Sequence, residues 1–418
     1  MFLSFKDLEI IQTGGMLMSK VYLVTAKRTP IGSFLGSLKG IEPGDLGAIV
    51  IKKVIEETGI NPADLDEVVM GNVLHAGHKQ GVGRQAAVKG GVPVEVPAYS
   101  VNMICGSGLK SVNLAYSEIK AGEANLILAG GVESMSNAGF VLPASVRTGF
   151  KMGDLKMKDH MVTDGLTDAF NDYHMGITAE NIVEKYGLTR EEQDEFAMNS
   201  QRKAIAAVDG GVFDEEIVPV EVKVKKETVL FSRDEHPNRK STPEILAKLK
   251  PAFKKDGSVT AGNASGLNDG ASVALLASEE AVAKYNLKPM AEIVAVGQGG
   301  VDPSIMGMGP VPAIKDVLTK AGLKLTDIEL FELNEAFAAQ SLGVIKQLCE
   351  DHGVTKEWIL ERANVNGGAI ALGHPIGASG NRILTTLAYE MRRREVTYGL
   401  ATLCIGGGMG ASIILKRI

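Results

Sequence analysis

The sequence predicts an α/β protein that contains the same structural unit twice. Segments with strand periodicity alternate with segments of helical periodicity over residues 21–131, and again from residue 260 to the C-terminus. In both regions a short apolar segment leads through a glycine-rich turn into a helix, and a further strand follows. Since strands that alternate with helices are typical of parallel pairing, we expect a mostly parallel sheet.

Composition narrows the possible classes of protein. A chain of 418 residues, 45% hydrophobic and 22% charged, is long enough for two or three globular domains. The net charge of −6 argues against a broad nucleic-acid-binding surface. No apolar run approaches the ~20 residues that a membrane-spanning helix needs. Three widely spaced cysteines and no signal-peptide pattern predict a reducing compartment, and we expect the cytoplasm.

The first half is predicted over residues 18–137 together with 260–288. Residues 1–17 are expected to be an extension, either an upstream start or a disordered tail. The residue patterns predict strands at 21–25, 65–73, 98–104, 125–129 and 271–277, and helices at 45–59, 84–90, 106–121 and 279–285.

Residues 138–259 are more polar and irregular, and we expect them to form an inserted lobe with a helix at 190–209. The second half is predicted over residues 289–418. Its patterns predict strands at 291–297, 328–333, 364–368 and 399–404, helices at 311–321, 338–349 and 373–393, and a last strand after the turn at 406–410.

Cys105 lies where a strand is predicted to turn into a helix. The unpaired N–H groups and partial positive charge of a helix N-terminus favour a thiolate. Gly106 and Gly108 would let other groups approach the sulfur closely. The pattern therefore indicates a nucleophile, although a free cysteine is also common as a small buried hydrophobic residue.

Three residues of the second half could complete a site around Cys105. His374 precedes a helix as Cys105 does, and a histidine beside a cysteine can hold the thiolate, although a core or capping histidine fits too. Cys404 precedes a glycine-rich turn that could present backbone N–H groups to an oxyanion; its alternative is a buried structural residue. Asn334 ends a strand, where α/β sites gather, or simply caps the next helix.

Other well-known site motifs are absent from the sequence. The turn at 406–410 does not lead from a strand into a helix, as a dinucleotide fingerprint requires. The sequence contains no GxxxxGK[ST] phosphate loop and no GxSxG nucleophile elbow. These absences argue against a nucleotide-hydrolysing enzyme and a serine hydrolase.

The sequence resembles the thiolases in five blocks that occur in the family's order, and the likeness covers about residue 18 to the C-terminus. The blocks are residues 102–108, 262–270, 334–337, 373–377 and 404–410. The resemblance implies a thiolase fold, in which two similar α/β halves form a five-layered αβαβα core and a loop domain (138–259), which binds CoA, is inserted into the first half.

The resemblance also implies a covalent mechanism. Cys105 would be the nucleophile acylated by acetyl-CoA, His374 would activate it, and Cys404 would take a proton from the methyl group of a second acetyl-CoA. Asn334, through a water, and His374 would stabilise the enolate. The backbone N–H groups of Cys105 and Gly406 would stabilise the tetrahedral intermediate. No metal or redox cofactor would then be required, because CoA thioesters are the substrates.

Residues 173–178 are similar to the short-chain biosynthetic branch of the family, in which a His-Met pair narrows the acyl pocket. His174 and Met175 would have this role. The run of basic residues around Arg239 could face the nucleotide phosphates of CoA or could simply be solvated. The other residues that the resemblance assigns to substrate and CoA are Phe253, Ala261, Ser265, Leu267, Ala336 and Phe337.

The expected reaction is the reversible joining of two acetyl-CoA molecules into acetoacetyl-CoA and CoA. The main alternative is a broad-chain 3-ketoacyl-CoA thiolase of fatty-acid β-oxidation. A decarboxylating ketoacyl synthase shares the fold but should lack an equivalent of Cys404, and a non-catalytic CoA-binding or lipid-binding homologue should have lost Cys105. The resemblance further suggests a homotetramer, built as a dimer of dimers.

Overall fold

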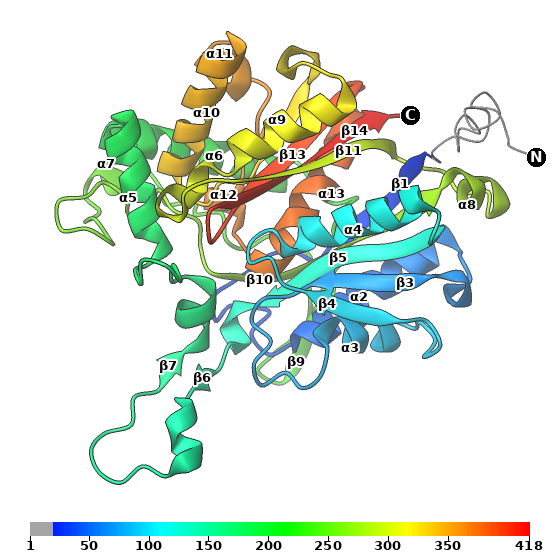
Figure 1. Cartoon of the computed structure of the whole chain (residues 1–418), viewed down its shortest axis with the longest axis horizontal. Coiled ribbons are helices and arrows are strands. Elements are labelled where there is room, and N and C mark those ends of the chain that lie inside the picture. The colour runs from blue at the N-terminus through cyan, green and yellow to red at the C-terminus, as the bar shows by residue number, and fades with distance from the viewer. Residues whose placement is uncertain (1–19) are drawn as a thin grey trace, which may run out of the picture.

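The computed structural model describes residues 20–418, so the predicted extension 1–17 lies outside the described residues. Figure 1 shows the second half, coloured yellow to red, above the first half, coloured blue to cyan. Among the helices of the described part, none is long and apolar enough to cross a membrane.

The first half follows the predicted order of elements. Glycines end two helices as predicted, because Gly59 and Gly122 adopt left-handed φ values of 67° and 77°. The elements of this half are β1 (Val21–Arg28), β2 (Gly32–Ser33), α2 (Pro43–Thr58), η1 (Pro62–Asp64), β3 (Glu67–Gly71), α3 (Val82–Lys89), β4 (Ala98–Val101), α4 (Ser107–Ala121), β5 (Leu126–Ser134), β10 (Asn268–Ser278) and α8 (Glu279–Lys284).

The second half repeats this plan after an initial strand, with a longer central helix. Its elements are β11 (Ala291–Gly300), η5 (Pro303–Met308), α9 (Pro310–Ala321), η6 (Leu325–Asp327), β12 (Leu330–Leu333), α10 (Ala338–His352), α11 (Lys356–Leu360), α12 (Ala369–Leu372), α13 (Ile376–Arg394), β13 (Tyr398–Ile405) and β14 (Met409–Arg417).

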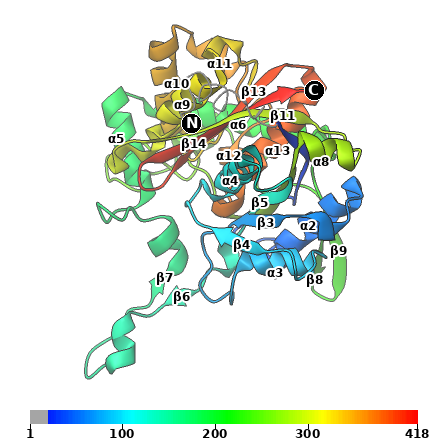
Figure 2. The same cartoon turned by 45° about the vertical axis from the view of Figure 1, so that its right-hand side comes forward.

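The segment between β5 and β10 contains the irregular elements, and its boundaries as a separate lobe stay a prediction. Helix α6 has the predicted bounds because Thr189 and Glu192 form a capping box at its start. Residues 138–160 form an arm that extends away from the body in Figures 1 and 2. The elements are η2 (Met135–Asn137), β6 (Phe140–Val141), η3 (Ala144–Thr148), β7 (Lys158–Asp159), the π-helical turn η4 (Met161–Gly165), α5 (Met175–Tyr186), α6 (Arg190–Asp209), β8 (Val220–Val224), β9 (Glu227–Phe231) and α7 (Pro243–Ala247).

The main sheet is mixed, so the prediction of a mostly parallel sheet is wrong. Its order is β12-β13-β14-β11-β1-β10-β5-β3-β4, and β1 joins the halves by pairing with β11. Strand β3 runs parallel to β4 and β5, and β12 runs parallel to β13. The last strand of each half returns antiparallel beside the others, and β13 and β14 form a hairpin, which must be antiparallel.

The two central helices lie between the two parts of this sheet and confirm the five-layered αβαβα fold. Leu109 and Val112 of α4 pack with Ile383 and Leu387 of α13, and strands of both halves surround them in one buried cluster. Helices α2 and α3 cover the outer face of the first half. Helices α9 and α10 cover the outer face of the second half, completing the five layers.

Two predicted strands differ most from the structure. The strand predicted at 125–129 continues to Ser134, because β10 pairs with it along this length. The strand predicted at 364–368 is wrong, since in this segment pairing is limited to an isolated bridge from Ala363 to Phe331. Asn364 adopts a φ of 46°, and its side-chain amide hydrogen-bonds to the backbone N–H and C=O of Leu333 at 2.8 and 2.7 Å. The side chain thereby replaces the missing strand backbone.

Candidate active site

Cys105 sits in a sharp turn between β4 and α4, two residues before the helix begins. The β-branched residue before it, Ile104, has a φ of 46°, which is a strained conformation for such a side chain. Two local hydrogen bonds hold the turn. Ile104 N donates to Asn102 Oδ1 at 2.9 Å, and Met103 N donates to Ser107 Oγ at 2.8 Å.

The thiol of Cys105 is partly accessible but poorly solvated. Burial raises its pKa to about 11, although the backbone N–H groups of Gly406 and of Cys105 itself point at the sulfur and act in the opposite direction. The backbone N–H groups therefore act in the predicted direction, but burial has the larger effect on the pKa of Cys105. Cys105 needs a base to become a nucleophile.

His374 has a ring nitrogen that carries no proton and has no partner among the described residues. Its Nδ1 lies 2.6 Å from Ser379 Oγ, and this hydroxyl donates its single proton to Pro375 O at 2.9 Å. The proton in the His374–Ser379 bond therefore belongs to Nδ1, and Nε2 is left as an acceptor. Among the described residues Nε2 has no hydrogen-bond partner. Burial, aided by the charge of Arg382, lowers the pKa of His374 to about 3, so the ring is neutral.

Cys404 is the penultimate residue of β13 and is fully buried. Burial raises the pKa of its thiol, and the electrostatic interaction with Cys105 raises it further. The turn that follows needs glycine, since Gly407 and Gly408 have φ values of 86° and 84°. Gly406 precedes them and presents its N–H to Cys105. The structure thus brings these predicted residues together.

Asn334 follows β12 and is 2% exposed. Its backbone N–H donates to Thr402 O at 3.0 Å, which continues the pairing toward Cys404. Within residues 20–418, neither its amide oxygen nor its amide nitrogen has a hydrogen-bond partner. Buried polar groups are almost always paired, so an unpaired amide here indicates a group that binds a ligand or a water.

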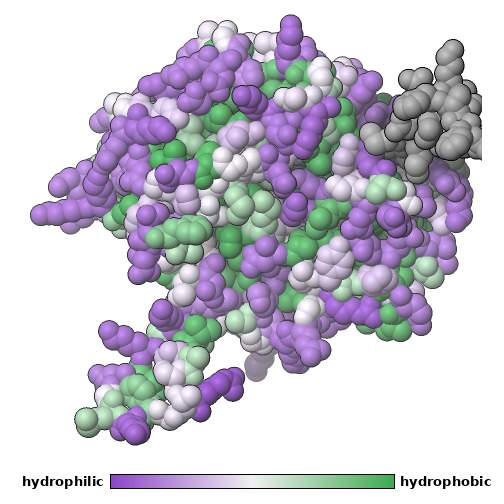
Figure 3. All heavy atoms as spheres, in the orientation of Figure 1, coloured by the Kyte–Doolittle hydropathy of each residue, from purple (hydrophilic) through white to green (hydrophobic). Residues whose placement is uncertain are grey.

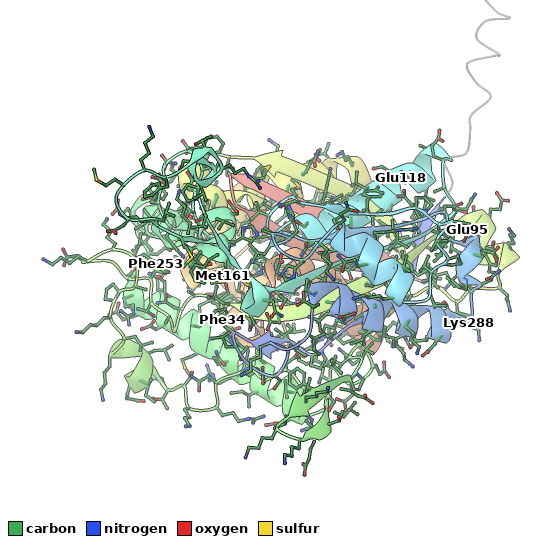
Figure 4. All side chains as sticks on the ribbon, turned by 90° about the horizontal axis from the view of Figure 1, so that it is seen from below. Phe34, Glu95, Glu118, Met161, Phe253 and Lys288 are labelled. Carbon is green, nitrogen blue, oxygen red and sulfur yellow. The ribbon has the colours of Figure 1, made fainter. Side chains whose placement is uncertain are left out.

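The residues predicted for the acyl pocket lie together. His174 Nδ1 accepts the Gly176 N–H at 3.0 Å, so the neutral ring carries its proton on Nε2. The ring stacks on Phe253 at 4.6 Å, and Phe253 meets Phe337 edge-to-face at 6.2 Å. Met175 joins Ala336, Phe337, Phe253 and Cys404 in one apolar cluster. In Figure 4 Phe253 and Met161 lie at one end of the molecule, away from Glu95 and Lys288.

The residues predicted to contact CoA lead away from this cluster. Leu267 packs against the apolar cluster beside Cys105, and Ser265 N donates to Ala336 O at 3.0 Å. Ala261 and Arg239 line a groove of about 580 Å³. Arg239 is not beside the thiols, and its guanidinium forms an exposed ion pair with Asp209 at 2.6 Å.

Several functional neighbours were not predicted from the sequence. His236 also lines the groove, and its ring comes so close to Gly266 that an added Cβ would lie 2.3 Å from it. Asn268 Oδ1 accepts the His374 N–H at 2.9 Å. Ser379 sets the tautomer of His374 from five residues along the chain. The one sequence signal for Ser379 is its position as a polar residue in the first turn of a helix that follows a glycine-rich loop.

Two other features bear on the predicted site. A separate cavity of about 520 Å³, between α6 and α10, is lined by none of the predicted site residues. Within the described part of the chain, no group of three His, Cys, Asp or Glu side chains could hold a metal ion. That the chemistry needs no cofactor stays a prediction.

Comparisons with known proteins place nearly the whole described chain in one family. The family model for the N-terminal domain of thiolases matches residues 21–280, and that for the C-terminal domain matches residues 287–417. An acetyl-CoA acetyltransferase of Pseudomonas aeruginosa is 55% identical over 96% of this chain and 100% of its own length.

Solved structures of similar proteins belong to the same family. The acetyl-CoA acetyltransferase of Syntrophomonas wolfei has a TM-score of 0.93 and 43% identity, and it covers 96% of this chain and 100% of that one. Human mitochondrial 3-ketoacyl-CoA thiolase has a TM-score of 0.91 and 44% identity with the same coverage. The likeness therefore extends over nearly the full length of each protein.

Proposed function

The chain belongs to the thiolase family, and we propose that it joins two acetyl-CoA molecules into acetoacetyl-CoA and CoA, reversibly, through an acetyl thioester on Cys105. The observation that carries this proposal is the meeting of Cys105, Cys404 and the Gly406 N–H between the two halves. Two relatives that are 55% and 54% identical over 96% of this chain are named acetyl-CoA acetyltransferases, which supports the same activity.

In the first half-reaction, His374 Nε2 takes the proton of Cys105 as the sulfur attacks the thioester carbonyl. The N–H groups of Cys105 and Gly406, which already point at the sulfur, would hold the oxyanion. Collapse of the intermediate releases CoA thiolate, and Cys404 gives it a proton. The products are acetyl-Cys105, free CoA, a protonated His374 and a thiolate at Cys404.

In the second half-reaction, the Cys404 thiolate takes a proton from the methyl group of another acetyl-CoA. Burial makes this thiolate a strong base, because it disfavours the charged form. The unpaired amide of Asn334, through a water, and the imidazolium of His374 would stabilise the enolate oxygen. The enolate carbon attacks acetyl-Cys105, and His374 returns its proton to the departing sulfur. Both cysteines are then thiols again, so the cycle balances.

The acyl pocket supports a short-chain substrate. The stacked pair of His174 and Phe253, with Met175 and Phe337 beside it, fills the space next to Cys404 with side chains. A long acyl chain would have to displace this packing. The broad-chain alternative deserves a direct test, since a human 3-ketoacyl-CoA thiolase is as similar in structure as the acetyltransferases are.

The test compares thiolysis of acetoacetyl-CoA with thiolysis of a ten-carbon 3-ketoacyl-CoA. We expect kcat/KM to favour acetoacetyl-CoA by at least about 10-fold, because the longer chain must open the stacked pair. A matched variant, Phe253→Ala, should narrow this preference by improving the longer substrate. A wild-type preference for the ten-carbon substrate would overturn the short-chain assignment.

We also propose that four copies assemble as a dimer of dimers, with the arm at residues 138–160 between copies. The arm exposes apolar side chains, among them Phe140 at 65%, Met152 at 92% and Met157 at 66%. Figure 3 shows green, apolar atoms on this projection. Sedimentation should give a tetramer, and replacing Met152 and Met157 by Ser should give smaller species; a wild-type monomer would refute the assembly.

We expect the enzyme in the cytoplasm, in keeping with its three unpaired cysteines.

A further inference from the structure

The hydrogen-bond register places Glu133 of the first half where Cys404 lies in the second. Each residue stands two positions beyond the last parallel pair between its strand and the neighbouring strand. The next strand gives the same correspondence, because Glu133 pairs with Gly270 of β10 and Cys404 pairs with Gly410 of β14. The two residues therefore occupy equivalent backbone positions.

The neighbours of these two residues correspond as well. Asn72 directly follows β3, and Asn334 directly follows β12. Cys105 stands two residues before α4, and His374 stands two residues before α13. Cys404 interacts electrostatically with Cys105, two residues before α4, so the equivalence predicts that Glu133 lies at the start of α13.

The contacts of Glu133 bear this out. Its side chain is fully buried and accepts four N–H groups. On the first-half side the donors are Asn72 Nδ2 at 3.0 Å, Val73 N at 3.1 Å and Leu74 N at 3.1 Å. The fourth donor, at 3.0 Å, is Gly377 N in the first turn of α13. One carboxylate thus ties the loop after β3 to the helix that follows His374.

Helix α13 depends on this distant cap. Its N-cap residue is Pro375, which provides no side-chain acceptor, so Glu133 supplies a negative charge and an acceptor at the helix start. The fit leaves no room for a side chain on Gly377, where an added Cβ would lie 2.7 Å from Glu133 Oε2. Ser379, which fixes the tautomer of His374, belongs to the same helical turn.

Glu133 also acts on the nucleophile through its charge. The Glu133 carboxylate raises the pKa of the Cys105 thiol, in addition to the larger effect of burial. Asp269 on β10 is the other acidic group that acts on Glu133. Burial raises the pKa of Glu133 itself to about 7, and its hydrogen bonds to the Leu74, Val73 and Gly377 N–H groups oppose this.

We propose that Glu133 is a positioning residue for the reaction: its carboxylate fixes the first turn of α13 and thereby the orientation of His374 toward Cys105. The inference rests on the proposed function, because it assumes that His374 is the base. The hydrogen bonds of Glu133 go to Asn72, Val73, Leu74 and Gly377 and not to the side chains of Cys105, His374 or Cys404, so its effect on orientation passes through the helix. In the first half, Glu133 occupies the backbone position that Cys404 occupies in the second half.

The test is Glu133→Gln in the full chain, measured by thiolysis of acetoacetyl-CoA. Glutamine offers a single acceptor oxygen, and its NH₂ group faces N–H donors, so part of the cap is lost. We expect kcat to fall ~100-fold, because small displacements of a catalytic group cost about that much. The KM for CoA should stay within about twofold, since the groove at His236 and Arg239 is separate.

Two further measurements separate positioning from general loss of structure. The control variant is Val317→Ala, at a fully buried position of α9. It should lower the melting temperature about as much as Glu133→Gln does and leave kcat unchanged. The pH dependence of Cys105 alkylation by iodoacetamide should shift to lower pH in Glu133→Gln, because a charge that raises the pKa of the thiol is gone.

Asn72→Ala is a milder variant for the case in which Glu133→Gln does not fold. It removes one of the four donors to Glu133 and should lower kcat about threefold.

The outcomes separate the two proposals. If the wild type shows no thiolysis, the proposed function fails. If the wild type is active and the folded Glu133→Gln or Asn72→Ala variant has the same kcat and the same alkylation profile, the positioning role is wrong. A loss of kcat that Val317→Ala reproduces at equal stability would also overturn it, because the effect would then be structural alone.

Discussion

The two halves differ at equivalent strand ends. In the first half these are the ends of β3 and β5, and in the second half they are the ends of β12 and β13. We call Glu133, Asn72 and Gly377 the Glu133 cluster, and Cys404, Asn334 and Cys105 the Cys404 cluster. The Glu133 carboxylate accepts four N–H groups. Among the described residues, neither atom of the Asn334 amide in the Cys404 cluster has a partner, whereas the Asn72 amide nitrogen donates to Glu133 and the Asn72 amide oxygen is unpaired.

This difference shows how one scaffold position can serve either structure or chemistry. A buried polar group with all its hydrogen bonds made holds its neighbours in place. A buried amide left without partners loses that stabilisation and is available to a ligand instead. At this backbone position the first half therefore supplies a rigid frame, and the second half supplies groups that act on the substrate together with Cys105 of the first half.

The residue types fit this division. Burial raises the pKa of Glu133 only to about 7, so its carboxylate is a weak base. Burial raises the pKa of the Cys404 thiol above the usual range of cysteine, so its thiolate is a far stronger base. Removing a proton from a thioester methyl group demands the stronger base. Cysteine at this position suits carbon–carbon bond formation, and glutamate at the equivalent position suits a helix cap.

The largest effect is expected from Cys105→Ala. Without the sulfur no acyl-enzyme can form, and thiolysis should fall by at least about 10⁴-fold. A steady-state assay with acetoacetyl-CoA and CoA measures this. Cys349→Ala is the matched control, because Cys349 lies on α10 outside the site. Substantial turnover by Cys105→Ala would show that another group carries the acyl chain.

The second prediction contrasts the two asparagines. Asn334→Ala should lower kcat about 100-fold, as expected for loss of an oxyanion donor. Its free energy of unfolding should change by less than about 0.5 kcal/mol, because the amide makes no hydrogen bond to be lost.

Asn72→Ala should show the reverse balance. It removes a hydrogen bond to the buried Glu133 carboxylate and should cost about 1–3 kcal/mol of stability. Its effect on kcat should be about threefold. Kinetics and urea unfolding of both variants measure the contrast. If Asn334→Ala is the less stable and Asn72→Ala the less active, the division between frame and chemistry is reversed.

The third prediction concerns pH. Because burial raises the pKa of Cys105 to about 11, the reactive thiolate is a minor form at neutral pH. The pKa of His374, lowered to about 3, leaves the ring neutral over this range, so it does not stabilise the thiolate as a cation. The rate of alkylation by iodoacetamide should rise about tenfold per pH unit between pH 7 and 10. A plateau near pH 7 would instead indicate a preformed thiolate–imidazolium pair.

Much of the site could be predicted because its residues lie in glycine-rich turns at the ends of regular elements. Cys105 and His374 precede helices in equivalent places, and periodicity alone showed this repeat. The Glu133 cluster could not be predicted in this way. A single glutamate in an apolar strand gives no signal of its partners, and Gly377 lies 244 residues away in the chain.

The fold was predicted less well where pairing depends on contacts distant in sequence. Strand direction is one example, since β10 returns antiparallel after the long insertion. The segment at Asn364 is another, because a side chain bonds to the backbone of Leu333 in place of a strand. Neither feature leaves a local pattern. The balance between burial and helix terminus at Cys105 likewise depends on the completed fold.

The central claim is that Cys105 carries the acyl group while Cys404 serves carbon–carbon bond formation. Peptide mass spectrometry of Cys404→Ala after rapid mixing with acetyl-CoA tests this most directly. We expect one acetyl group on the Cys105 peptide and acetoacetyl-CoA formation slowed ~10³-fold, because the base is gone while the nucleophile remains. Absence of the adduct, acetylation at another residue, or normal condensation by this variant would contradict the account.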